Sequence, residues 1–209
     1  KIDEILSRNK TPILVGGTGL YIKAALYDYK FSDEKIVNNY ETLTNEEIYN
    51  ELLKYDKNNK IHINNRKRLI RALNYCLPFS QKEKTDKLIY DSIFIGLTTD
   101  RSILYDRINK RVDVMVTEGL LEEAKQIYDS NIRTKAVTTP IAYKELFPYF
   151  ENKETLDVCL EKIKQNSRKY AKRQYTWFNN QMNVTWFNVN FNDFNKTIDE
   201  VYEYIKKLV

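Results

Sequence analysis

Three short apolar runs constrain the fold of this chain more than any other feature of its sequence. They lie at residues 13–15, 93–97 and 184–189. A glycine-rich turn and a helical pattern at residues 20–26 follow the first run, and a long helical pattern over residues 101–130 follows the second. Strand, loop, helix and strand in this order are typical of a parallel sheet with helices packed on it. The sequence therefore predicts an α/β fold with a parallel sheet and flanking helices.

The strand signals fade in the middle of the chain. Amphipathic helical patterns at residues 46–55 and 65–76 stand there, in a stretch rich in Asn and Lys. We interpret residues 33–90 as a small helical insertion domain, which divides the α/β core into residues 1–32 and residues 91–209. The chain begins without Met and inside a helical pattern, so we expect it to be part of a longer protein.

Basic residues outnumber acidic residues only slightly, 34 to 29, but they are clustered along the chain. The clusters are Arg66, Lys67, Arg68 and Arg71; Arg101, Arg107, Lys110 and Arg111; and the cations within residues 162–173. Basic clusters interleaved with aromatic residues suit phosphate backbones and unstacked bases. Solvated helix faces have the same composition, because long basic side chains also cover apolar surface with their stems. Composition alone leaves both interpretations open.

Several classes of protein are disfavoured. No apolar run approaches the roughly 18 residues of a membrane span, and no signal peptide is visible, so we expect a cytoplasmic protein without a membrane segment. Cys76 and Cys159 are too isolated for a metal knuckle or a disulfide framework, and we expect reduced thiols. The single histidine, His62, has no nucleophile or second histidine near it and is interpreted as structural.

The turn Gly16-Gly17-Thr18-Gly19 separates the first apolar run from a helix. Backbone N–H groups converge at such a turn and the helix dipole adds partial positive charge, so the turn suits a phosphate group. The Thr18 hydroxyl can donate one more hydrogen bond. The turn is neither a Walker loop nor a G-x-G-x-x-G fingerprint, however. A phosphate site and a simple tight turn both stay open.

Arg107 and Arg111 lie four residues apart in the long helical pattern and project from one face of it. Two guanidinium groups on one face can neutralise a diphosphate leaving group as its charge develops. The alternative is an exposed face laced with ion pairs to Asp106, Asp113 and Glu118.

A basic helix is expected over residues 154–180, and a last helix over residues 194–208. The cations of the basic helix form two pairs with a spacing of four residues, which suits a nucleic-acid backbone. These pairs are Arg168 with Lys172 and Lys169 with Arg173. The alternative for Arg173 is an inward position, paired with a carboxylate at the edge of the sheet.

Five segments, in this order along the chain, resemble those of bacterial tRNA dimethylallyltransferases. They are residues 12–21, 64–73, 104–121, 143–146 and 170–178, the last followed by a strand that contains a tryptophan. The chain departs from the family pattern at Ala142-Tyr143, where Gly-Tyr is usual, and at Asn179, where a basic residue is common. The resemblance covers nearly the whole chain and implies a P-loop NTPase-like parallel sheet.

The resemblance implies transfer of a dimethylallyl group from dimethylallyl diphosphate to N6 of the adenosine on the 3′ side of the anticodon in tRNA. That base must leave its stack to be reached. The partners implied are the tRNA anticodon stem-loop and dimethylallyl diphosphate; no protein partner is inferred. In the family a P-loop-like segment and an Asp that acts as general base come before the part that this chain matches, and Mg²⁺ assists the diphosphate. We therefore expect the Mg²⁺ ligands mostly before Lys1, and no metal ligand is assigned in this chain.

The resemblance also implies roles for individual residues. The turn residues Gly16, Gly17, Thr18 and Gly19 would bind the diphosphate. Thr18 and Arg111, helped by Arg107, would be catalytic. The residues expected to hold the anticodon stem-loop are Arg68, Arg71, Tyr143, Lys144, Lys172, Arg173, Gln174, Thr176 and Trp177.

Three other functions stay open. An adenylate isopentenyltransferase would use the same fold and donor but prenylate a free nucleotide. A P-loop nucleotide kinase and a non-catalytic RNA-binding module belong to other classes. The helical insertion and the basic C-terminal helix favour a macromolecular acceptor.

Overall fold

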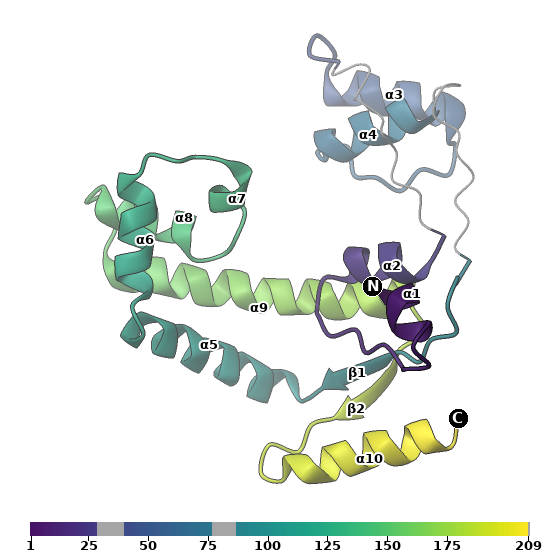
Figure 1. Ribbon diagram of the computed structural model, residues 1–209. Coiled ribbons are helices and arrows are strands. Elements are labelled where there is room, and N and C mark those ends of the chain that lie inside the picture. Colours follow the sequence, from purple (N-terminus) through teal and green to yellow (C-terminus); the bar gives the residue numbers. More distant parts are fainter. Residues whose placement is uncertain (29–39, 77–86, 209) are drawn as a thin grey trace. The chain divides into compact units, whose positions relative to one another are not determined.

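The computed structural model describes residues 1–28, 40–76 and 87–208 and divides the chain into two compact units (Figure 1). The first unit comprises Lys1–Gly19 and Ser92–Val209, and the second comprises Leu20–Asp91. The sequence places the insertion domain at residues 33–90, and its first boundary lies outside the described residues.

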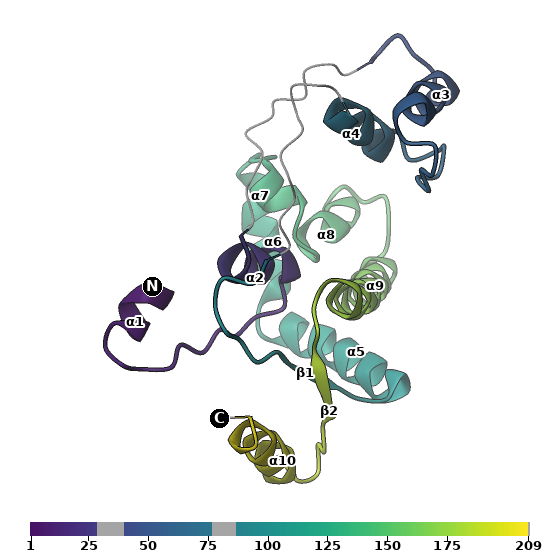
Figure 2. The ribbon, with the colours of Figure 1, turned by 90° about the vertical axis from the view of Figure 1, so that its right-hand side faces the viewer.

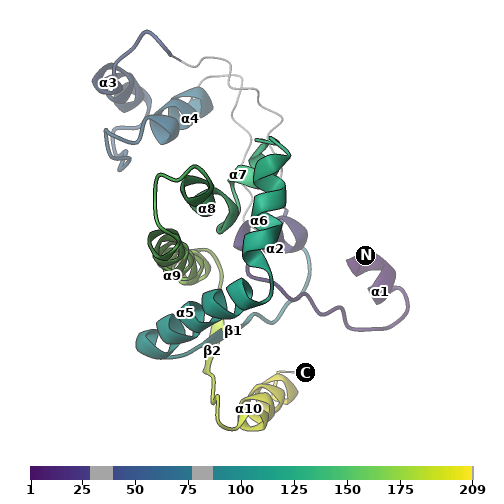
Figure 3. The ribbon, with the colours of Figure 1, turned by 90° about the vertical axis from the view of Figure 1, so that its left-hand side faces the viewer.

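A two-stranded parallel sheet lies at the centre of the first unit. Strand β1 (Ile95–Thr98) pairs with β2 (Thr185–Asn188), and Ile95 stands opposite Thr185. Helix α10 (Phe194–Lys206) lies on one side of the strands, and α5 (Arg101–Thr117) and α9 (Leu156–Gln181) lie on the other (Figures 1, 2 and 3). The predictions of an α/β fold, of parallel pairing and of flanking helices are confirmed.

The strand expected at residues 13–15 is wrong. These residues have no regular structure, and Ile13 and Val15 are 84% and 91% exposed. A strand forms only where a neighbour takes up its N–H and C=O groups. Within the described residues β1 and β2 pair with each other and leave residues 13–15 without a partner strand. The apolar run at residues 13–15 suggested a strand, but such a run forms a strand only when a second strand pairs with it.

The long helix expected over residues 101–130 is two helices. Helix α5 (Arg101–Thr117) ends before Gly119, and α6 (Leu120–Asp129) begins after it. Gly119 has φ of 102°, a left-handed conformation that ends helices and that costs glycine little. Asp100 is the residue before α5, and its side chain makes no capping hydrogen bond.

The main hydrophobic core of the first unit joins α5 and α6 to α8 (Tyr143–Phe150) and α9 (Leu156–Gln181). Its buried members are Val112, Leu120, Ala124, Ala142, Leu146, Cys159 and Ile163. Four residues separate the two buried members on α6 and the two on α9, so one stripe of each of these helices is buried. The sequence predicted α9 closely, whereas α8 and the short α7 (Lys135–Thr138) were not anticipated. The first residues of the unit form α1 (Ile2–Leu6).

The second unit contains α2 (Gly19–Leu26), of which Gly19 belongs to the first unit, and a helical hairpin of α3 (Asn45–Tyr55) and α4 (Arg66–Cys76). The hairpin buries Ile48, Leu52, Leu69 and Leu73 completely or almost so. Thr44 and Glu47 form a reciprocal capping box that fixes the start of α3. Both helices of the hairpin were predicted and are confirmed.

Candidate functional site

The glycine turn is held against α9. The Gln174 side-chain amide donates a hydrogen bond of 2.8 Å to the Gly17 carbonyl oxygen. A Cβ atom added to Gly19 would lie 2.0 Å from the Trp177 indole, so only glycine fits there. Thr18 is exposed and directly precedes α2, where the first backbone N–H groups of a helix have no partner within it. The turn thus presents its threonine to solvent while α9 supports its glycines.

Arg107 and Arg111 are both exposed on α5. The Arg107 guanidinium lies over the Phe191 ring, 4.0 Å from its centroid. Arg111 makes no hydrogen bond or ion pair with any residue that the structure describes. Two cations four residues apart on a helix repel each other. Neither arginine is paired with an acidic residue of the described chain, so an external anion could relieve this repulsion.

The acidic residues of α5 pair with lysines instead. Asp106 lies 2.8 Å from Lys110, and Asp113 lies 2.6 Å from Lys164 of α9. The sequence left open that these carboxylates form ion pairs with the two arginines. Among the described residues they form none. Neither guanidinium makes a hydrogen bond to the glycine turn within that same part of the chain.

The start of α8 is built around the buried carboxylate of Glu145. Its Oε2 accepts from the Ala142 backbone N–H at 3.0 Å, and its Oε1 accepts from the Asn166 amide at 2.8 Å. Ala142 has φ of 110° and ψ of −55°, a conformation that favours glycine. The departure from Gly-Tyr at this position therefore places a strained alanine where the backbone calls for glycine.

Tyr143 and Lys144 follow directly. The Tyr143 hydroxyl donates a 2.5 Å hydrogen bond to the Glu123 carboxylate, which raises the pKa of the tyrosine. Lys144 is exposed, and its Nζ lies 4.0 Å from Glu145. The two residues that were assigned to RNA thus stand beside each other at one helix start.

The basic helix α9 divides its cations between two roles. Arg168 is half-buried and donates to Asn109 of α5 at 2.7 Å and to Glu161 at 2.8 Å. Its spacing from Lys172 had suggested a phosphate contact. Arg168 instead ties two helices together and is not free for a phosphate. Lys172 and Arg173 are exposed, and the Arg173 guanidinium lies 5.8 Å from the Tyr170 ring centroid.

The basic cluster of α4 is divided in the same way. Arg66 donates to the carbonyls of Tyr40 and Leu43 and to the side chain of Asn45, at 2.6, 2.8 and 3.0 Å. Arg68 and Arg71 are exposed, opposite the buried stripe of the helix. These two arginines are three residues apart and present one face.

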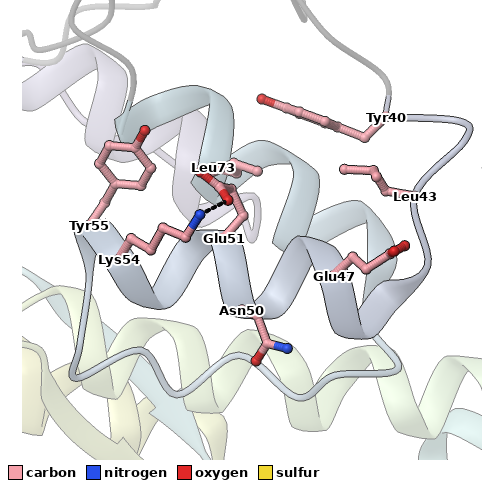
Figure 4. Close-up of a pocket in the computed structure, with 8 residues that line it drawn as sticks. All are labelled: Tyr40, Leu43, Glu47, Asn50, Glu51, Lys54, Tyr55 and Leu73. Carbon is pink, nitrogen blue, oxygen red and sulfur yellow. Dashed lines mark hydrogen bonds and ion pairs between the residues drawn. The ribbon is translucent and has the colours of Figure 1, made fainter.

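A groove of about 430 Å³ runs along α3 in the second unit (Figure 4). Its lining residues are Tyr40, Leu43, Glu47, Asn50, Glu51, Lys54, Tyr55 and Leu73. Glu51 pairs with Lys54 at 2.5 Å, and Glu47 accepts from the Thr44 N–H and hydroxyl, which lowers the Glu47 pKa. Both carboxylates are therefore engaged by groups of the protein itself.

Several residues that support the site were not found from the sequence. Asn109, Asn166 and Asn179 each hold a functional segment through one side-chain amide, and an isolated asparagine carries no periodic signal. Asn179 accepts from the Trp186 indole N–H at 2.8 Å. A lysine or arginine could not accept this bond, so the departure at Asn179 fits the local structure. The Glu145 carboxylate was detectable, since an acid three residues into a helix is a known capping pattern.

Other chemistry is sparse in the described ranges, 1–28, 40–76 and 87–208. No group of three or more His, Cys, Asp or Glu residues there could hold a metal ion. Both cysteines are free thiols, and burial raises the pKa of each. His62 Nδ1 accepts from the Asn64 N–H at 3.2 Å within a turn, which is a structural role. Each helix in this part of the chain is too short or too polar to cross a bilayer.

The fold and the site define a class: a helix-rich α/β protein in which a long basic helix supports a glycine turn. Residues 1–181 match the family model described as IPP transferase, and the chain belongs to this family. Relatives from bacteria agree. The chain is 44% identical over 221 residues to the tRNA dimethylallyltransferase of Geobacillus thermodenitrificans and 43% over 218 residues to that of Anoxybacillus flavithermus. Each comparison covers 98% of this chain and 70% of the relative.

Solved structures give the same result. The tRNA delta(2)-isopentenylpyrophosphate transferase of Staphylococcus epidermidis superposes with a TM-score of 0.67 at 37% identity. That comparison covers 100% of this chain and 73% of the other. The full-length tRNA isopentenylpyrophosphate transferase of Bacillus halodurans also gives a TM-score of 0.67, at 40% identity, over 99% of this chain and 69% of the other.

Proposed function

We propose that this protein transfers a dimethylallyl group from dimethylallyl diphosphate to tRNA, at N6 of the adenosine on the 3′ side of the anticodon. The observation that carries the proposal is its family membership, with identities above 40% to tRNA dimethylallyltransferases across 98% of the chain. The names of these relatives give tRNA as the acceptor. They therefore do not favour the prenylation of a free nucleotide or a nucleotide kinase reaction. No observation favours a non-catalytic module.

The glycine turn and α5 would serve the donor. We assign Gly16, Gly17, Thr18 and Gly19 to the diphosphate, because the turn precedes a helix and leaves Thr18 exposed. Arg111 would meet the negative charge that grows on the diphosphate as the carbon–oxygen bond breaks, with Arg107 as its helper. Arg111 has no competing carboxylate among the described residues, which supports this assignment.

The exposed cations would serve the acceptor. We assign Arg68 and Arg71 on α4, Tyr143 and Lys144 at the start of α8, and Lys172, Arg173 and Thr176 on α9 to the anticodon stem-loop. All are positioned by helices whose opposite faces are buried, so the cations can grip phosphates without loss of packing. Sequence identity would then be read from splayed loop bases.

We assign no metal ligand in this chain. A P-loop NTPase-like architecture and Mg²⁺ assistance to the diphosphate belong to the proposal as family expectations. Within this chain the groups that would meet the departing diphosphate are backbone N–H groups, one hydroxyl and two guanidiniums.

Thr18→Ala in the intact protein tests the donor assignment. If the hydroxyl donates to a phosphate oxygen in the transition state, turnover should fall by on the order of 10²–10³, while tRNA affinity stays unchanged. Steady-state kinetics with both substrates, together with tRNA binding, give the two readouts. Thr117→Ala is the matched control: its hydroxyl donates to the Val114 carbonyl of its own helix, and its loss should leave the donor KM and the tRNA affinity unchanged. Wild-type turnover and donor KM in Thr18→Ala would contradict the assignment.

A further inference from the structure

Gln174 and Trp177 contact the glycine turn from one face of α9. The residues are three apart, which places them on the same side of a helix. Gln174 reaches the Gly17 carbonyl, from which it is separated by 157 residues of sequence. Because a carbonyl oxygen only accepts, the group that faces it must be the NH₂ of the amide.

This hydrogen bond also sets the direction of a donor in the turn. The Gly17 carbonyl and the Thr18 N–H belong to one planar trans peptide, in which C=O and N–H point in opposite directions. When α9 draws the carbonyl toward itself, the Thr18 N–H is turned away from α9. The bond therefore fixes the orientation of an N–H group that the proposed diphosphate would meet.

Trp177 fixes the next peptide by contact. The ring carbons Cε3 and Cζ3 would lie 2.0 and 2.1 Å from a Cβ atom on Gly19, so the indole occupies the space of a side chain at that residue. Gly19 is buried, whereas Thr18 beside it is exposed. The indole thus closes the turn on one side and leaves the other side for a ligand.

Helix α9 is tied to its neighbours in the turns that precede these two residues. Its earlier turns are tied to α5 by Lys164 with Asp113 and Arg168 with Asn109, and to α8 by Asn166 with Glu145. A support that is itself fixed at several points can hold a turn in one geometry at little further entropic cost.

We propose that Gln174 and Trp177 are positioning residues for the diphosphate turn. Their side chains act on the donor site from behind, and only their exposed neighbours Lys172, Arg173 and Thr176 face an RNA. This inference rests on the proposed function of the turn. It replaces the RNA contacts that sequence suggested for Gln174 and Trp177 with a role in donor binding and turnover.

Gln174→Ala in the intact protein is the first test. The loss of one net hydrogen bond corresponds to a fall of roughly 3- to 10-fold in kcat/KM for dimethylallyl diphosphate. The dissociation constant for substrate tRNA should stay within about twofold of wild type, since no phosphate contact is removed. A variant with unchanged donor kcat/KM and weaker tRNA binding would overturn the proposal and make Gln174 an RNA contact.

Gln174→Glu gives a readout that a merely structural role would not move. A protonated carboxyl group can donate to the Gly17 carbonyl, whereas the ionised form only accepts and repels it. The donor kcat/KM of this variant, divided by that of wild type at each pH, should therefore rise as pH falls. The same ratio for Gln174→Ala should be flat. A flat ratio for Gln174→Glu would also overturn the proposal, and this arm decides if the alanine variant does not fold.

Gln165→Glu is the matched control, because it makes the same chemical change on an exposed part of the same helix. Its ratio to wild type should be flat with pH and near one. Failure of the proposed function is a separate result: the wild-type protein would then transfer no dimethylallyl group to tRNA. The effect of Gln174 is measured only relative to a wild-type protein that does.

Discussion

The basic clusters of α4 and α9 look alike in sequence and share one structural rule. In each, the first arginine is used by the protein itself: Arg66 bonds three acceptors in the helical hairpin, and Arg168 bonds Asn109 and Glu161. Later cations in each cluster are exposed. The two helices differ in the face that does not carry the exposed cations. Helix α4 buries only apolar residues there, whereas α9 also holds the glycine turn through Gln174 and Trp177.

This difference teaches where an effect on chemistry should arise. Changes to the exposed cations of either helix should alter RNA affinity alone, because none of these side chains touches the turn. Changes to the other face of α9 should alter the donor site.

The largest effect is expected from removal of the exposed cations. Each lost phosphate contact flattens the plot of log affinity against log salt by roughly 0.7–0.9. Lys172→Ala with Arg173→Ala should therefore reduce the slope by roughly 1.5–2, and so should Arg68→Ala with Arg71→Ala. Both double variants should weaken substrate tRNA and a tRNA without the target adenosine equally. Fluorescence binding across a salt series measures this.

The donor KM is the control for both double variants and should not move. A pair that retains the full salt slope does not contact phosphate, and the comparison between the helices would then fail for that pair. Selective loss of the substrate tRNA alone would instead indicate contact with base edges.

A smaller effect is expected from the two inward arginines. Arg66→Ala and Arg168→Ala should each lower the free energy of unfolding by about 1–3 kcal/mol, because each removes hydrogen bonds from a charged donor, most of them partly buried. Arg66 should cost more, since it serves three acceptors and Arg168 two. Urea unfolding provides the measurement. The exposed neighbours Lys67→Ala and Lys169→Ala should stay within about 0.5 kcal/mol of wild type. Equal losses in the neighbours would show that helix propensity, and not the bonds, sets the effect.

The smallest effect concerns the strained alanine beside α9. Ala142→Gly should raise the free energy of unfolding by about 1 kcal/mol, because relief of backbone strain outweighs the loss of one buried methyl group and the greater freedom of the unfolded chain. Gly119→Ala should lower the free energy of unfolding, because alanine is strained at the φ of 102° that Gly119 adopts. A Cβ atom there would meet nothing closer than 3.7 Å, so the effect would come from the backbone and not from a clash. Thermal unfolding of both variants checks the two signs. A lower melting temperature for Ala142→Gly would mean that its methyl packing matters more than its backbone.

Much of the fold could be predicted because its signals are local. The hairpin helices and α9 follow from apolar residues spaced three and four apart, and β1 and β2 from short apolar runs next to turns. The strand at residues 13–15 failed because a strand also needs a partner, which no local pattern supplies. Helix α7 was missed because four residues are too few to show a helical period. Helix α8 was missed because it contains Pro148, and proline disfavours a helix interior.

By itself, the sequence determined the class of fold, the order of the main helices and the residue types available for a diphosphate and an RNA. These depend on contacts within a few residues or on composition. Only the tertiary structure decided which arginines turn inward, why Ala142 is strained and what Gln174 holds. Such choices depend on which groups meet across the chain, as Gly17 and Gln174 do over 157 residues, and a side chain's partner is fixed only once the helices pack.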